Sequence, residues 1–120
     1  MNYSEVKILV IDDEKMILEM LRRMLTKIGF TVDVTESAEE GIKKLHNNPY
    51  DLILTDIKMP EMSGNDFFNY VKNDLEQSTP IIAMSGTPWL LENSDFDDVI
   101  AKPFCKEELF NVVSQFVQIA

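Results

Sequence analysis

Short apolar runs alternate with longer amphipathic segments along this chain. Four apolar runs lie at residues 6–11, 52–55, 80–84 and 99–101, and we expect a further short strand at residues 31–34. An apolar run of this length is typical of a strand that is buried on both faces, as in a parallel sheet. The pattern therefore predicts five short strands.

The segments between these strands have apolar residues at helical spacing. Residues 14–28 are the first predicted helix, which ends at Gly29 because glycine favours the left-handed conformation of a helix end. Residues 37–47 are the second, and Ser37 with Glu40 forms its capping box. Two further helices are predicted at residues 65–73 and 104–117. The residues expected to face the core from these four helices are Ile17, Leu18, Leu21, Leu25, Ile28, Ile42, Leu45, Phe67, Phe68, Val71, Leu109, Val112, Val113 and Phe116.

Strands that alternate with helices predict an α/β fold with a parallel sheet. We expect a three-layer, flavodoxin-like, doubly wound fold in which five parallel strands take the order 2-1-3-4-5. A chain of 120 residues, 45% of them hydrophobic, is expected to form one domain over residues 1–120. In this strand order the first and third strands are neighbours, and their carboxyl ends meet at the point where ligands bind.

Acidic residues follow these two neighbouring strands. Asp12 and Asp13 close the first apolar run, and Asp56 closes the run at residues 52–55. Three carboxylates in one crevice repel one another unless one is protonated or a hard divalent cation neutralises them. Magnesium fits best, because it accepts one or two carboxylates, keeps several waters and leaves positions for phosphate oxygens.

A hydroxyl and an ammonium group are expected at the same edge of the sheet. Ser85 ends the fourth predicted strand and Lys102 ends the fifth. Phosphoryl transfer needs positioning and charge neutralisation, which a metal ion, a lysine and a hydroxyl supply. Asp56 is the expected nucleophile, since a carboxylate can form an aspartyl-phosphate and Asp56 is the only acid at the end of its strand.

These residues lie in four motifs that together resemble the response-regulator receiver domains, and the resemblance covers the chain from end to end. Each motif alone is common in unrelated proteins, but the four in this order are highly specific. They are Val10-Ile11-Asp12-Asp13-Glu14, Asp56-Ile57-Lys58-Met59-Pro60-Glu61-Met62-Ser63-Gly64, Met84-Ser85-Gly86 and Lys102-Pro103-Phe104.

The resemblance implies a role for each residue of the site. Asp56 is the phosphoacceptor, Ser85 is the switch hydroxyl, and Lys102 contacts the phosphoryl group. Magnesium is expected to lie among Asp12, Asp13, Asp56 and the backbone carbonyl of Lys58. The peptide bond between Lys102 and Pro103 is expected to be cis.

The implied function is that of a receiver in two-component signal transduction, similar to the single-domain chemotaxis-type receivers. A histidine kinase or phosphotransfer protein donates the phosphoryl group, and the receiver then signals through contact with an unknown downstream protein. The chain is then a phosphoacceptor that catalyses its own phosphorylation and dephosphorylation, not an enzyme with a separate substrate. One alternative is a phosphorylation-independent interaction module, or pseudo-receiver. Another is an aspartyl-phosphate phosphohydrolase, which is disfavoured because no segment is available to line a substrate site.

Two departures from the family pattern affect the expected output. Ser85 and Lys102 are only 17 positions apart, which shortens the fourth helix after its start at Thr87-Pro88. Receivers commonly signal and dimerise through this helix, so we expect a monomer. Val99 stands where receivers usually carry a switching aromatic ring, and its short, stiff side chain cannot reproduce the ring's movement.

The composition limits the possible partners and compartment. The formal net charge is −10, which disfavours direct contact with nucleic acid because phosphate binding needs clustered lysine and arginine. No apolar stretch is long enough to span a membrane, and no signal peptide is apparent. With one cysteine an internal disulfide is excluded, and these features together predict a cytoplasmic location.

Overall fold

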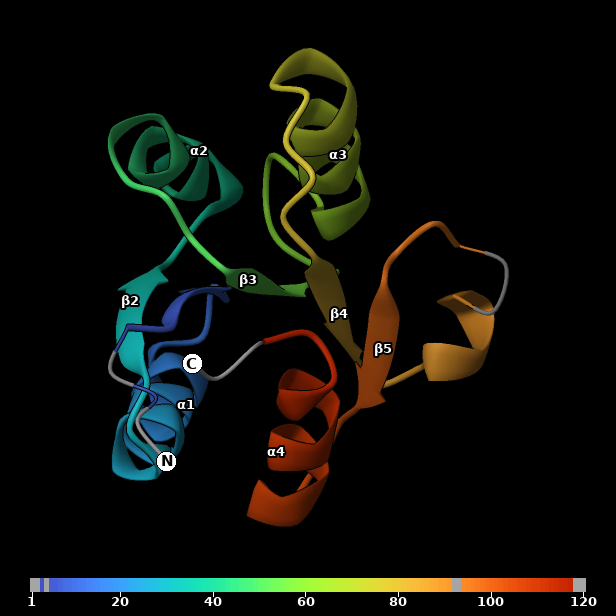
Figure 1. Ribbon diagram of the computed structural model, residues 1–120. Helices are drawn as coiled ribbons and strands as arrows, with labels where there is room; N and C mark the ends of the chain where they lie inside the picture. Colours follow the sequence, from blue (N-terminus) through green and yellow to red (C-terminus); the bar gives the residue numbers. More distant parts are fainter. Residues whose placement is uncertain (1–2, 4, 92–93, 118–120) are drawn as a thin grey trace.

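The computed structural model describes residue 3, residues 5–91 and residues 94–117. A parallel five-stranded sheet of order β2-β1-β3-β4-β5 forms its centre (Figure 1). The predicted α/β class and strand order are therefore confirmed. The strands are β1 (Lys7–Ile11), β2 (Thr31–Thr35), β3 (Leu52–Asp56), β4 (Ile81–Ser85) and β5 (Asp98–Ala101).

Helices cover both faces of the sheet and complete the three layers. In Figure 1, α1 and α4 lie on one side of the sheet, and α2 and α3 lie on the other. None of the described helices combines the length and apolar character needed to cross a membrane. The helices are α1 (Lys15–Ile28), α2 (Ala38–Asn47), α3 (Gly64–Asn69), its π-helical continuation η1 (Tyr70–Asp74), the 3₁₀ turn η2 (Pro88–Leu91) and α4 (Lys106–Ser114).

Two hydrophobic cores lie on the two faces of the sheet. Alternate residues of a strand point to opposite faces, so Ile8 and Val10 pack with α1 and α4, whereas Leu9 and Ile11 pack with α2 and α3. All four side chains are completely buried. The central strands are apolar on both faces for this reason, and the polar side chains of β3 and β4 lie at their carboxyl ends.

The predicted helix ends agree with the structure at the first two helices but not at the last. Gly29 has φ 121°, a conformation that side chains other than glycine rarely adopt, and it ends α1 as expected. Ser37 accepts a hydrogen bond from the backbone N–H of Glu40 at 3.2 Å, which caps α2. The prediction of a last helix over residues 104–117 was too long, because Cys105 is still extended and the helix ends at Ser114.

The fourth helix is reduced to a single turn. Residues Pro88–Leu91 form a 3₁₀ turn. The sequence predicts that Asn93-Ser94-Asp95 ends this helix; Ser94 and Asp95 are not helical, and Asn93 lies outside the described residues. Such a short turn buries little, and it leaves Trp89 65% and Leu90 71% exposed. The shortening predicted from the spacing of Ser85 and Lys102 is therefore confirmed.

Candidate functional site

Three carboxylates meet at the carboxyl ends of two adjacent strands. Strands β1 and β3 are paired with Ile11 opposite Thr55, so the residues that follow, Asp12 and Asp56, are also neighbours. One carboxylate oxygen from each of Asp12, Asp13 and Asp56 lies within 4.8 Å of the others. Asp12 and Asp56 are buried, whereas Asp13 is exposed. The structure thus brings together the three acids that the sequence places at the strand ends.

The ammonium group of Lys102 lies between two of these carboxylates. Its Nζ atom is 3.1 Å from Asp12 Oδ2 and 3.2 Å from Asp56 Oδ1. The Lys102-Pro103 peptide is cis, as expected. The backbone N–H of Lys102 donates to the carbonyl of Ser85 at 2.8 Å, which ties the end of β5 to the end of β4.

Ser85 is the last residue of β4 and is largely buried. Its hydroxyl oxygen accepts a hydrogen bond from the backbone N–H of Thr87 at 3.0 Å, and Thr87 Oγ1 lies 3.4 Å away. Either hydroxyl can be the donor in the contact between Ser85 and Thr87. Thr87 was not singled out as a contact of Ser85 by the sequence, because a bond between residues two apart depends on the turn that follows the strand.

A pocket of about 280 Å³ opens between these groups. Lys58 lines it and has an exposed side chain, while the ligand role of its carbonyl remains a prediction. The lining residues also include a glycine and a threonine from the segment after β4. Together the lining residues bring hydroxyl, ammonium and carboxylate groups into one cavity. The full lining is Asp13, Glu14, Asp56, Ile57, Lys58, Ser85, Gly86, Thr87 and Lys102.

Two backbone features hold the acids in place. The backbone N–H of Glu14 donates to Asp12 Oδ1 at 2.9 Å, so the first turn after β1 orients this carboxylate. At Gly64, a Cβ atom would lie 2.5 Å from the backbone oxygen of Asp56 and 2.9 Å from the Cα of Ile57. The start of α3 can approach the segment at Asp56 and Ile57 this closely only with glycine. The sequence contained this signal as the last residue of the second motif.

Burial and like charge set the electrostatics of Asp56. Burial raises the pKa of its carboxyl group above the ordinary value, and the negative charge of Asp12 raises it further. Lys102 and the backbone N–H of Ile57 oppose this increase. Burial acts to lower the pKa of Lys102, but the charges of Asp12 and Asp56 outweigh it and raise that pKa. Lys102 is therefore held in its charged form beside the acids.

The two oxygens of Asp56 differ in their surroundings. Oδ1 accepts from the backbone N–H of Ile57 at 3.0 Å and from Lys102 at 3.2 Å. Oδ2 accepts no hydrogen bond from any residue that the structure describes. Asp56 lines the pocket described above. The protein therefore fixes one oxygen of Asp56, Oδ1, by two hydrogen bonds.

Comparison with known protein families gives one match over most of the chain. The family model described as the response regulator receiver domain matches residues 8–114. The chain belongs to this family. Receiver domains serve two-component response regulators as phosphoacceptors, and modification of an aspartate is typical of them.

Curated relatives are longer than this receiver. The chain is 38% identical over 108 residues to the response regulator ArlR of Staphylococcus haemolyticus, covering 86% of this chain and 48% of that protein. It is 30% identical over 116 residues to the transcription factor SKN7 of Candida albicans, covering 90% of this chain and 20% of that protein. The receiver thus spans half or less of the length of these two relatives.

Solved structures show the same fold. The response regulator TrrA of Thermotoga maritima, solved with Mg²⁺ and BeF, matches with a TM-score of 0.85 and 29% identity over 93% of this chain and 99% of that one. The chemotaxis protein CheY4 of Vibrio cholerae has a TM-score of 0.86, covering 95% of this chain and 100% of that one. At 24% identity the CheY4 match supports the fold alone.

Proposed function

We propose that this receiver accepts a phosphoryl group on Asp56 from a histidine-containing protein and transmits the signal by protein contact. The observation that carries the proposal is the asymmetry of the Asp56 carboxylate. Its Oδ1 atom is held by Ile57 and Lys102, while Oδ2 has no hydrogen-bond partner among the described residues, and Asp56 lines the pocket. A carboxylate held in this way presents one oxygen as a nucleophile without needing to reorient.

In the proposed transfer, Asp56 Oδ2 attacks the phosphorus of a phosphohistidine. An O–P bond forms, the P–N bond breaks, and its electron pair remains on the imidazole nitrogen. The ammonium of Lys102 and the hydroxyl of Ser85 line the same pocket, where they neutralise and donate hydrogen bonds to the phosphoryl oxygens. Water later attacks the phosphorus in the same pocket: a new O–P bond forms, the bond between Asp56 Oδ2 and phosphorus breaks, and the carboxylate and inorganic phosphate are released, so the domain also catalyses its own dephosphorylation.

The carboxylate cluster fits a magnesium ion. The donors of Asp12, Asp13 and Asp56 are all oxygens, and they lie within 4.8 Å of one another, as ligands of one small cation must. These residues, with the backbone carbonyl of Lys58, would hold the ion. When bound, magnesium supplies positive charge that offsets the carboxylates and the incoming phosphoryl group.

Modification of Asp56 is the decisive test. Wild type and Asp56→Asn are incubated with Mg²⁺ and acetyl phosphate, and intact mass is measured. Wild type should gain one phosphoryl group, and Asp56→Asn should gain none. Asp95→Asn, which removes an exposed carboxylate outside the pocket, is the matched control and should be modified like wild type. No gain by wild type, while a known receiver in the same tube is modified, would support the alternative of a phosphorylation-independent module.

The partners and location follow from this proposal. The donor is a histidine kinase or phosphotransfer protein, and we place the receiver in the cytoplasm as a monomer. The net charge of −10 disfavours direct contact with DNA, so the downstream target is a protein. The relatives named as a transcription factor and a response regulator are longer proteins, of which this chain covers 20% and 48%.

A further inference from the structure

Strand β5 leads into Lys102 at its carboxyl end, but apolar packing holds this strand weakly. Among the described residues it is an edge strand, with β4 as its one neighbouring strand (Figure 1). Of the four side chains of β5 only Ile100 is buried, whereas all five side chains of β4 are buried. The helix before β5 is reduced to the turn Pro88–Leu91. Burial therefore contributes little to the position of β5, and polar contacts become important.

The amino end of β5 is anchored by Asp97, the residue directly before the strand. Asp97 Oδ2 accepts a hydrogen bond from the backbone N–H of Ile81, the first residue of β4, at 2.7 Å. The backbone N–H of Asp97 donates to the carbonyl of Ile81 at 3.0 Å. Asp97 therefore binds both backbone groups of Ile81, and it fixes the start of β5 against the start of β4.

Lys72 of η1 supports the Asp97 carboxylate from a second side. Its Nζ atom lies 3.5 Å from Asp97 Oδ2 and donates to the carbonyl of Thr79 at 2.8 Å. The same ammonium lies 5.7 Å from the centre of the Phe68 ring, and that ring packs against Phe96 at a centroid distance of 4.8 Å. The helical segment α3–η1 is thus joined to the residues before β5, and the carboxylate is held in one orientation.

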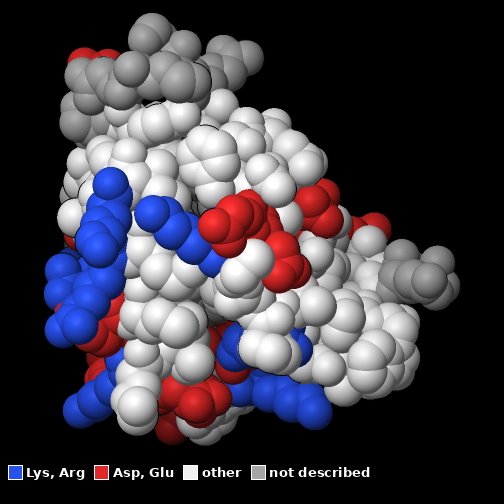
Figure 2. Space-filling model, turned by 90° about the horizontal axis from the view of Figure 1, so that it is seen from below, with Lys and Arg blue, Asp and Glu red and all other residues white. Residues whose placement is uncertain are grey.

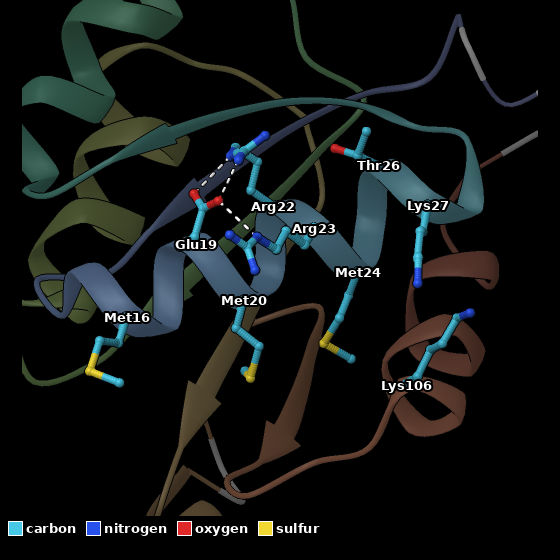
Figure 3. Close-up of a pocket in the computed structure, with 9 residues that line it drawn as sticks. All are labelled: Met16, Glu19, Met20, Arg22, Arg23, Met24, Thr26, Lys27 and Lys106. Carbon is cyan, nitrogen blue, oxygen red and sulfur yellow. Dashed lines mark hydrogen bonds and ion pairs between the residues drawn. The ribbon is translucent and has the colours of Figure 1, made fainter.

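Ion pairs elsewhere on the surface do not have this character. Figure 2 shows acidic and basic side chains beside one another on one face of the molecule. In Figure 3, Glu19 pairs with Arg22 and Arg23 of the same helix, and these side chains are 43–75% exposed. Such pairs contribute little and join no distant segments. The side chains of Lys72 and Asp97 are only 22% and 35% exposed, and their pair joins two separate segments.

The position of β5 determines where Lys102 lies. The Nζ atom of Lys102 contacts both Asp12 and Asp56, at 3.1 and 3.2 Å. Backbone hydrogen bonds repeat along a strand, so they do not by themselves select one register. A shift by one residue moves the chain by about 3.3 Å, which is as long as these two hydrogen bonds. The side-chain bond of Asp97 favours the observed register, because it forms when Asp97 lies beside Ile81.

We propose that Asp97 is a positioning residue for Lys102. It holds β5 in register on β4 and thereby keeps the ammonium of Lys102 at the two carboxylates. The inference rests on the proposed function, in which Lys102 neutralises the phosphoryl oxygens. Asp97 does not line the phosphoacceptor pocket, since it precedes β5 and the pocket lies at the carboxyl ends of the strands. The anchor compensates for the reduced fourth helix, which gives β5 little cover.

The test compares Asp97→Ala with two other variants. Asp97→Asn keeps an oxygen that can accept from the N–H of Ile81, and it should behave as wild type. Asp98→Ala is the matched control, because Asp98 accepts only from the adjacent N–H of Val99 among the described residues. Circular dichroism establishes that each variant is folded at the temperature of the assays.

The first measurement is NMR of the receiver with lysine labelled at Cε. The signal of Lys102 is identified by its loss in Lys102→Arg. Asp97→Ala should shift this signal, and neither Asp97→Asn nor Asp98→Ala should do so. Lys72→Met keeps an apolar side chain near Phe68 but removes the ammonium beside Asp97, so it should cause a smaller shift in the same direction. This milder variant provides the test if Asp97→Ala does not fold.

The second measurement is the rate at which acetyl phosphate with Mg²⁺ modifies Asp56, followed by intact mass. Asp97→Ala should lower this rate about tenfold, because a displacement of about 1 Å can cost about a hundredfold. In Lys102→Ala no ammonium remains to be positioned, so the further change Asp97→Ala should alter the rate by less than about twofold. A general loss of structure would instead lower the rate equally in both backgrounds.

Three results would overturn the inference: a Lys102 signal that neither Asp97→Ala nor Lys72→Met shifts, an equal shift in Asp98→Ala, or an equal loss of rate with and without Lys102. If wild type is modified normally when one of these is found, the proposed function still stands. If wild type gains no phosphoryl group, the proposed function fails. A Lys102 signal that depends on Asp97 would then still show that Asp97 positions the ammonium.

Discussion

Asp13 offers the cleanest perturbation of the acidic cluster. Its carboxylate lies within 4.8 Å of those of Asp12 and Asp56, yet it makes no hydrogen bond or ion pair with any other described residue. Asp12, in contrast, also accepts hydrogen bonds from the ammonium of Lys102 and from the backbone N–H of Glu14. The substitution Asp13→Asn therefore removes one negative charge without breaking an existing contact.

The magnitude follows from Coulomb's law. Two unit charges 4.8 Å apart repel by about 0.9 kcal/mol in bulk water and by about 3.5 kcal/mol at an effective dielectric constant of 20. Asp13 is exposed, so each of its two repulsions is near the lower figure, and attraction to the nearby Lys102 offsets part of them. We expect Asp13→Asn to raise the free energy of unfolding by about 1 kcal/mol without metal. For 120 residues this corresponds to a rise in Tm of about 4 °C.

Magnesium should reverse the order of the melting temperatures of wild type and Asp13→Asn. An ion at one hundred times its Kd stabilises the folded state by about 2.7 kcal/mol, and Asp13→Asn has one charged ligand fewer. Wild type should therefore melt below the variant in EDTA and above it in saturating Mg²⁺.

Thermal unfolding by circular dichroism at constant ionic strength measures this crossing. Asp95→Asn, which alters an exposed acid outside the pocket, should behave as wild type. If Asp13→Asn melts no higher than wild type in EDTA and keeps the full response to Mg²⁺, the three acids do not share an ion.

Four other outcomes are expected. Gly64→Ala should lower the free energy of unfolding by about 1–3 kcal/mol in chemical denaturation, because its Cβ meets backbone atoms. Gly86→Ala, where a Cβ meets open space, should lower it far less, and equal losses in the two variants would refute the close approach at Gly64. Asp56→Asn without metal should exceed wild type in stability at neutral pH, since the raised pKa of Asp56 means that its ionised form destabilises the fold. This difference in stability should narrow as the pH falls through the raised pKa and Asp56 of wild type becomes protonated. A difference that does not depend on pH would show that ionisation of Asp56 is not its cause. Beryllofluoride with Mg²⁺ should change the fluorescence of Trp89, which lies in the 3₁₀ turn after Ser85, and Ser85→Ala should weaken this change. If the fluorescence stays constant while binding is confirmed, this turn does not respond to beryllofluoride at Asp56. Light scattering should show a monomer with and without beryllofluoride, and a dimer formed on activation would refute the expectation drawn from the shortened fourth helix.

The sequence alone determined the topology and the position of each acid along it. Apolar runs can be buried on both faces only in a sheet covered by helices, so the alternation predicts a parallel α/β sheet. The flavodoxin-like strand order, which agrees with the resemblance to receiver domains, makes the ends of β1 and β3 neighbours. The spacing between Ser85 and Lys102 likewise forced a reduced fourth helix, because chain length limits the number of turns. Local signals such as Gly29 fixed one helix end because they act through the conformation of a single residue.

Only the tertiary structure decided how groups distant in sequence meet. The end of α4 at Ser114 differs from the predicted end because helical spacing continues in residues that leave the helix yet still pack, such as Val117. The place of Lys102 between Asp12 and Asp56, which leaves Asp56 Oδ2 free, requires the ends of three strands to be set against one another. Periodicity specifies which face of a helix is apolar but not which element lies near it, so only the folded structure brings residues of α1 and Lys106 of α4 to one pocket.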